Sequence, residues 1–140
     1  MGSLRIARYR AEHVDTDAGG VVHFTRYASW LESAVLEGLE DLGLGVGGLG
    51  ERGLVPAVTE LTMKYVRSAR FLDRIEVRAR VDHVGGASVR FAGEVRLSDG
   101  ALLAAGTLVW CLVDDTAGAA VRLPASFRAN LRDSMEESAR

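Results

Sequence analysis

The spacing of apolar residues changes twice along the chain, from alternation to a helical repeat and back. Residues 4–13 mix apolar side chains with Arg and Glu, as expected for a strand with one solvent-exposed face. From Tyr27 apolar residues recur at steps of three and four, which predicts a helix of roughly four turns with one apolar face. That face consists of Tyr27, Trp30, Leu31, Ala34, Val35, Gly38, Leu39 and Leu42.

Strand-like segments follow Pro56, separated by short turns. One turn is Asp99-Gly100, and Asp-Gly between two alternating runs is a strong hairpin signal. A terminal helix is expected at 123–135, with Pro124 at its start. The expected strands cover about 55–68, 72–84, 87–98 and 101–113.

This order of elements predicts an α+β fold in which a long, curved antiparallel sheet wraps around one central helix, the hotdog architecture. The strands need about a dozen residues each, which is long. We expect one domain over residues 1–140, with its core at about 4–115 and a helical tail at about 123–135. Exposed edges of long strands pair with something, so we also expect a homodimer.

The glycine-rich segment 43–53 contains G-x-G-x-x-G at Gly43, Gly45 and Gly48. A dinucleotide-binding loop needs a strand before it and a helix after it, and here the order is reversed. The segment instead suggests a helix C-cap followed by a flexible loop near an active-site mouth.

Composition narrows the class of protein. A net charge of −2 and a pI near 5.9 give no basic surface for nucleic acid. Cys111, the single cysteine, excludes an intramolecular disulfide and is expected to be buried and inert. No apolar run of about 18 residues is present, and the first ten residues lack the apolar part of a signal peptide. A soluble cytoplasmic domain is the expectation.

The most informative polar stretch is Asp15-Thr16-Asp17-Ala18-Gly19-Gly20. It begins like a calcium loop, but the twelfth position, which must be acidic, is Arg26. The stretch can be an ordinary turn that caps the next helix. It also places two carboxylates just ahead of unpaired helix N–H groups, which suit a carbonyl oxygen gaining negative charge. Asp17 could then serve as nucleophile or base.

Other residues add little chemistry. His13, His23 and His83 have no metal-ligand spacing, so neither a metal nor a redox cofactor is implied. His23 lies six residues after Asp17 and could line a pocket or be structural. No G-x-S-x-G motif supports a serine hydrolase triad.

The segment DTDAGGVVHFTRYASWLESA, residues 15–34, resembles the 4-hydroxybenzoyl-CoA thioesterase family of hotdog proteins, near the branch associated with the Tol–Pal system. Residues 56–81 resemble the family's second and third strands, and the likeness covers roughly 4–115. The run HFTRY is similar to thioesterases that release polyketide chains from carrier proteins. The resemblance implies hydrolysis of an acyl-CoA or acyl-carrier-protein thioester.

By this resemblance Asp17 is the catalytic carboxylate. We expect Asp15 to be a turn or capping residue and not a second catalyst. The helix N–H that polarises the thioester carbonyl falls at about Phe24, beside His23. Family sites lie at a dimer interface, so Thr59 and Glu60 would face the partner's Asp17. Dimers are expected to assemble into a homotetramer.

The resemblance also implies residues for substrate binding. Arg67 and Arg70 would contact a pantetheine or nucleotide phosphate. Tyr27, Trp30 and Leu31 would line an apolar slot for the acyl chain between the two helices of a dimer.

Two alternatives stay open at this stage. A non-catalytic hotdog module that binds acyl thioesters would have no need of Asp17. A hotdog dehydratase needs a histidine paired with an acid. The Tol–Pal branch often has a histidine seven residues after the aspartate, where this chain has Phe24, with His23 one position earlier.

Overall fold

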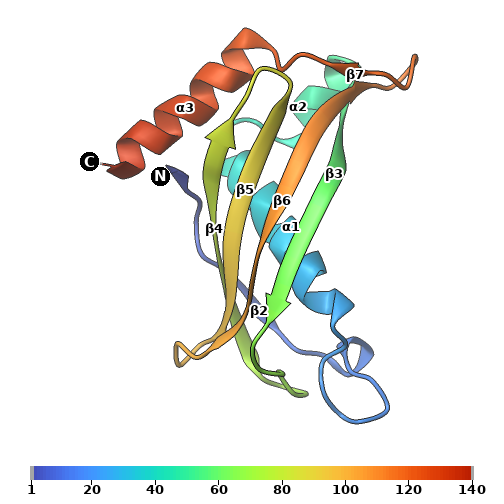
Figure 1. Cartoon of the computed structure of the whole chain (residues 1–140), viewed down its shortest axis with the longest axis vertical. Coiled ribbons are helices and arrows are strands. Elements are labelled where there is room, and N and C mark those ends of the chain that lie inside the picture. Colours follow the sequence, from blue (N-terminus) through green and yellow to red (C-terminus); the bar gives the residue numbers. More distant parts are fainter. Residues whose placement is uncertain (1, 140) are drawn as a thin grey trace.

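The computed structural model describes residues 2–139, with side chains described for residues 3–135. One long helix, α1, lies across a curved antiparallel sheet (Figure 1). The strands are β1 (Gly2–Ser3), β2 (Ala7–Arg10), β3 (Leu54–Tyr65), β4 (Arg74–Val84), β5 (Ser88–Leu97), β6 (Leu102–Asp114) and β7 (Ala120–Val121). The helices are the 3-10 turn η1 (His13–Asp15), α1 (Thr25–Asp41), α2 (Val46–Glu51) and α3 (Ala125–Ala139).

The main strands stand in the order β1-β4-β5-β6-β3, with β2 also paired to β4 and β7 paired to β6. Every pair is antiparallel. The four long strands lie within three residues of their predicted bounds. Of the predicted strand at 4–13 only the middle, β2, pairs with β4, and its last residue, His13, begins η1.

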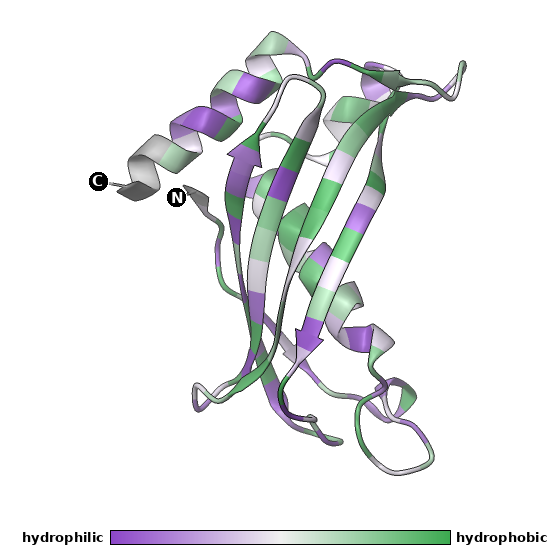
Figure 2. Cartoon of the chain, in the orientation of Figure 1, coloured by the Kyte–Doolittle hydropathy of each residue, from purple (hydrophilic) through white to green (hydrophobic). Residues whose placement is uncertain are grey.

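The core lies between the sheet and α1. In β4 Ile75, Val77, Ala79 and Val81 are buried while the alternate residues are charged and face outward, as period-two patterning requires. Figure 2 shows hydrophobic and hydrophilic bands alternating along the strands. All residues of the predicted apolar helix face are buried except Leu42, which is half buried. Each large side chain buried in this way contributes about 1.5–3 kcal/mol.

Helix α1 ends where glycine permits it to end. Gly43 has a φ of 73°, and its N–H donates to Glu40 O at 3.0 Å. The Leu44 N–H donates to Leu39 O at 2.9 Å, which completes a Schellman cap. The predicted C-cap is therefore confirmed.

The glycine-rich segment beyond that cap departs from the sequence expectation of a flexible loop near the active-site mouth. Its middle forms α2, because Leu44 and Leu49 are buried and hold the segment against the core. It also lies at the C-terminal end of α1, whereas the acidic turn precedes the N-terminal end. Those two ends are about 25 Å apart for a helix of 17 residues.

Two smaller features complete the description. Cys111 is half buried rather than buried, because Trp110 and Leu112 take the inward positions and leave Cys111 on the outer face of β6. The predicted terminal helix is present as α3, which packs on β1 and β4 and buries Phe127 and Leu131. No helix among the described residues has the length and apolar character needed to cross a membrane.

Candidate active site

Asp17 sits in a tight turn between η1 and α1. Its backbone O accepts the Gly20 N–H at 3.0 Å, and its N–H donates to Val21 O at 2.9 Å. Gly20, with a φ of 78°, takes the left-handed conformation that the turn requires. The carboxylate atom Oδ1 accepts the Gly19 N–H at 2.8 Å, which fixes the side chain. Among the described residues none donates to the other oxygen, Oδ2, so one carboxylate oxygen stays available on an exposed side chain.

Asp15 plays a different part. It is 3% exposed, and its Oδ2 accepts the Glu12 N–H at 2.7 Å. Its Oδ1 lies 2.7 Å from Arg26 Nε, and its backbone O accepts the His23 N–H at 2.8 Å. Asp15 thus forms the capping box of η1 with Glu12, and it does not cap α1, whose cap position is Phe24.

The first turn of α1 begins beside this turn. Phe24 occupies the cap position, and no hydrogen bond engages its backbone N–H within residues 2–139. The next N–H, of Thr25, reaches His23 Nδ1 at 3.3 Å, and the Thr25 hydroxyl lies 2.7 Å from the same nitrogen. Because Nδ1 accepts from an N–H here, the neutral ring carries its proton on Nε2. His23 therefore caps the helix, while the Phe24 N–H has no hydrogen-bond partner among the described residues.

A hollow of about 200 Å³ opens beside Phe24. Phe24 and Tyr27 each meet the Tyr65 ring edge-on, at centroid distances of 6.2 Å and 5.7 Å. Tyr27 is fixed because its hydroxyl oxygen accepts the Ala69 N–H at 2.9 Å. Burial raises the pKa of the Tyr27 phenol, so it stays neutral near pH 7. The lining residues are Val22, Phe24, Tyr27, Tyr65, Val66, Arg67 and Ser68.

The other expected binding residues are spread more widely. Arg67 lines the hollow, whereas Arg70 is exposed in the following loop, where its backbone pairs with Val21. Thr59 and Glu60 are exposed on β3, at a bulge after Val58, and neither lines this hollow.

Trp30 and Leu31 lie deeper than the acyl-slot expectation requires. They are 5% and 0% exposed, because both belong to the face of α1 that packs into the core. Trp30 lies between the rings of Tyr27 and Tyr9. Neither side chain lines the hollow beside Phe24, and their place in a slot between the two helices of a dimer stays a prediction.

Sequence reasoning missed Tyr65. It ends β3, far along the chain from Phe24, and no local pattern brings the two rings together. Their contact depends on how the sheet curves around α1. The sequence offers one clue: Tyr65 alternates with Leu61 and Met63, so the three side chains lie on the same, inner face of β3. This alternation does not show which residue Tyr65 contacts across the fold.

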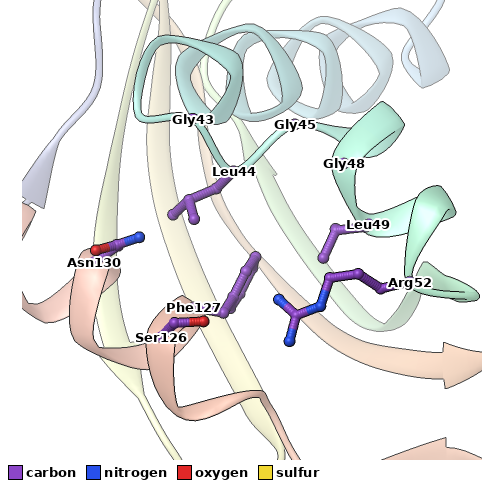
Figure 3. A pocket seen from close by; sticks show the side chains of 9 residues that line it. All are labelled: Gly43, Leu44, Gly45, Gly48, Leu49, Arg52, Ser126, Phe127 and Asn130. Carbon is purple, nitrogen blue, oxygen red and sulfur yellow. The ribbon is translucent and has the colours of Figure 1, made fainter.

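A second pocket, of about 220 Å³, lies between the glycine-rich segment and α3 (Figure 3). Leu44, Leu49 and Phe127 converge on it, with Arg52 at one side. It stands at the C-terminal end of α1 and includes no residue of the acidic turn. Among the described residues no group of three or more His, Cys, Asp or Glu side chains is placed to hold a metal ion.

Comparison with known proteins decides the family. The model of the thioesterase-like superfamily matches residues 12–131. The chain belongs to the thioesterase-like superfamily. This membership confirms the predicted family, the hotdog fold and the enzyme class, an acyl thioester hydrolase.

The chain is similar in sequence to proteins named as thioesterases. It is 27% identical over 132 residues to the chloroplastic acyl-acyl carrier protein thioesterase ATL3 of Arabidopsis thaliana, covering 92% of this chain and 68% of that one. It is 27% identical over 123 residues to the acyl-CoA thioester hydrolase YbgC of Escherichia coli, covering 88% and 92%.

Solved structures share the fold. A hypothetical protein from Thermus thermophilus superposes with a TM-score of 0.85 at 30% identity, covering 91% of this chain and 97% of that one. The DHNA-CoA thioesterase of Staphylococcus aureus superposes with a TM-score of 0.87 at 21% identity, covering 99% and 92%. At that lower identity the likeness concerns the fold.

Proposed function

We propose that this protein hydrolyses an acyl-CoA or acyl-carrier-protein thioester through Asp17, with the Phe24 N–H polarising the thioester carbonyl. One observation carries the proposal. Asp17, whose carboxylate has one free oxygen, lies in the short hairpin of residues 15–23, and Phe24, whose N–H has no hydrogen-bond partner among the described residues, follows that hairpin directly. An unpartnered N–H at a helix start stabilises a developing oxyanion, and removing such a donor typically costs about 10²–10³ in rate.

Two routes fit this geometry. In one, Asp17 Oδ2 attacks the carbonyl carbon, the C–S bond breaks, and the thiolate leaves with the bonding electrons and takes a proton from water. A water molecule then cleaves the mixed anhydride to the free acid and restores the Asp17 carboxylate. In the other, Asp17 takes a proton from water, and the resulting hydroxide attacks the carbonyl. The C–S bond then breaks, and the leaving thiolate takes the proton back from Asp17. Either route converts thioester and water to acid and thiol.

The hollow next to Phe24 is the proposed entrance for the substrate. Phe24 and Tyr27 supply an aromatic wall, and Arg67 on its rim supports binding of a pantetheine or nucleotide phosphate, with Arg70 further along the same loop. His23 contributes by capping the helix rather than by reaching the hollow. Trp30 supports this wall from behind through its contact with Tyr27.

The site is proposed to be completed by a second copy of the chain. Thr59 and Glu60 lie on β3, which has no strand neighbour on its outer side among the described residues. Pairing of β3 with its counterpart would bring these side chains toward the partner's turn at Asp17, and two dimers would form the tetramer. Residues 1–140 are taken as one thioesterase domain. The acyl group of the proposed substrate can be a polyketide chain.

The decisive experiment measures thiol release from acyl-CoA, acyl-pantetheine and acyl-carrier-protein thioesters. Asp17→Asn is expected to lower turnover by about 10²–10⁴-fold, the usual size of such a catalytic contribution. Asp99→Asn is a matched control, because Asp99 Oδ1 also accepts the N–H of the second residue after it, Ala101, at 2.9 Å. Equal activity of both variants would overturn the role of Asp17. Tight binding of these thioesters without turnover would favour the binding module, and loss of water from a 3-hydroxyacyl thioester would favour the dehydratase.

A further inference from the structure

We propose that Asp15 and Arg26 are positioning residues, which hold the Asp17 turn against the first turn of α1. The inference rests on the proposed function of Asp17, and it assigns a role to two side chains that would not touch the substrate. Its basis is an ion pair between a buried carboxylate and a partly exposed guanidinium: Oδ1 of Asp15 lies 2.7 Å from Nε of Arg26.

The burial of Asp15 needs an explanation. Its side chain is 4% exposed, and a carboxylate taken out of water is costly unless it is paired and hydrogen-bonded. A turn could be capped at the surface at no such cost. Here the Glu12 N–H donates a hydrogen bond to Oδ2, and the Arg26 guanidinium supplies the opposite charge beside Oδ1.

The pair joins two segments that must keep a fixed distance. Asp15 stands two residues before Asp17, and Arg26 stands two residues after Phe24. Between them the hairpin is closed by the Thr16–Val22 bridge and by the His23 N–H, which donates to Asp15 O at 2.8 Å. The backbone therefore links the hairpin at its base, and the ion pair adds a link to the body of the helix. This second link restrains the distance between the Asp17 carboxylate and the Phe24 N–H.

The contact depends on charge more than on hydrogen-bond direction. Arg26 Nε is buried and close to Oδ1, but the contact does not have hydrogen-bond geometry. Another cation of similar length should therefore replace Arg26, while a neutral side chain should not. This gives the proposal a conservative variant, Arg26→Lys, to set against Arg26→Gln.

A matched ion pair elsewhere in the chain separates positioning from general stability. Arg90 Nε lies 2.8 Å from Asp82 Oδ2 on the outer face of the sheet. This pair joins the same residue types through the same guanidinium nitrogen. Arg90→Gln removes it without touching the Asp17 turn.

The experiment measures kcat and KM for thiol release on one acyl-CoA substrate. Arg26→Gln is expected to lower kcat by about tenfold to a hundredfold with KM within about twofold, because a small misplacement of reacting groups costs rate rather than binding. Arg26→Lys should retain kcat within about threefold, and Arg90→Gln should match the wild type. A fall of kcat in Arg26→Gln no larger than in Arg90→Gln, or an effect on KM alone, would overturn the proposal.

A double variant covers the case in which the single variant does not fold. If Arg26→Gln fails to fold, the double variant Asp15→Asn with Arg26→Gln removes both charges and leaves no uncompensated buried carboxylate. It should fold and still show the loss of kcat; wild-type kcat in this variant would refute the pair's role.

Amide hydrogen exchange separates this proposal from the proposed function. The Gly19, Gly20 and His23 N–H groups are hydrogen-bonded in the hairpin and should exchange at least about tenfold faster in Arg26→Gln. Unchanged exchange would refute the pair even if Asp17 proves catalytic. Faster exchange together with activity that is indifferent to Asp17 would refute the proposed function and leave the pair as the element that orders this turn.

Discussion

The hydroxyl oxygen of Tyr27 accepts the backbone N–H of Ala69 at 2.9 Å, which ties α1 to the loop that follows β3. Tyr27 is 2% exposed and Ala69 is 0% exposed, so water does not replace this bond if it is lost. The loop carries Arg67 and the rim of the hollow. This one hydrogen bond therefore holds the loop at the proposed substrate entrance against the buried face of α1.

Replacement of Tyr27 by Phe should lower the free energy of unfolding by about 1–3 kcal/mol, because a buried N–H is left without a partner. Urea unfolding measures the change. Tyr65→Phe removes the same hydroxyl from an exposed ring that has no hydrogen-bond partner in residues 2–139, and it should be neutral. Equal loss in both variants would mean that the Ala69 contact does not carry the effect.

Gly93 of β5 lies directly under Leu31 of α1. A Cβ at position 93 would overlap Leu31 Cδ1 and lie 3.3 Å from the Arg78 carbonyl oxygen. Leu31 is fully buried, so its side chain cannot turn out into solvent to make room. Gly93→Ala should therefore destabilise the fold by about 1–3 kcal/mol through overpacking.

Gly47 provides the contrast for that substitution. It lies in α2, and nothing stands within 4 Å of a Cβ built there. Because alanine favours helix over glycine by about 1 kcal/mol, Gly47→Ala should be neutral or stabilising. Thermal or urea unfolding of Gly93→Ala and Gly47→Ala would measure both changes in stability. A stable Gly93→Ala variant would show that the helix can shift away from the sheet.

The Tyr9 hydroxyl donates a hydrogen bond to the Glu37 carboxylate, and burial together with this bond raises the pKa of Tyr9 well above its usual value. A pKa that is higher in the folded state means that this stabilisation is fully present below the unfolded value of about 10. It is lost as the pH rises from there toward the folded value. The difference in unfolding free energy between wild type and Tyr9→Phe should thus shrink above about pH 10. A difference that grows with pH would contradict the assignment.

The elements that sequence predicts best are those whose signal is local. The helix face from Tyr27 to Leu39 repeats with the helical period, and burial on one side follows directly. The strands after Pro56 alternate for ten residues or more. The glycine-rich segment was harder, because local propensity argues against α2 and only the packing of Leu44 and Leu49 holds it.

The candidate site divides in the same way. Asp17, Asp15 and Phe24 lie within ten residues, so turn and capping rules place them. Tyr65 and the loop around Arg67 reach the site only through the curvature of the sheet, which no periodicity encodes. Trp30 lies on the face of α1 that packs into the core, and its expected contact with the substrate stays a prediction.

The edge strand β3 exposes apolar side chains on the face that elsewhere packs against α1. Val58, Leu61 and Tyr65 pair with Trp110, Leu108 and Ala104 on that inner face, yet they are 45%, 47% and 49% exposed. The partners on β6 are buried, at 2%, 2% and 0%. An exposed apolar edge of this length is unusual in a monomer, because it pairs readily with another chain. A second copy of this chain is the occupant that the proposed site also requires.

Val58→Lys should therefore abolish the proposed dimer, because a buried lysine at its centre is left without a counterion. Val46 in α2 is 44% exposed against 45% for Val58, so Val46→Lys adds the same charge at matched exposure away from the edge. Sedimentation should give a mass smaller than that of the wild type for Val58→Lys only. Thiol release should fall with it, since Thr59 and Glu60 then no longer meet a partner's Asp17. A Val58→Lys variant that keeps the wild-type mass would place the interface elsewhere, and a monomer with full activity would show that each chain holds a complete site.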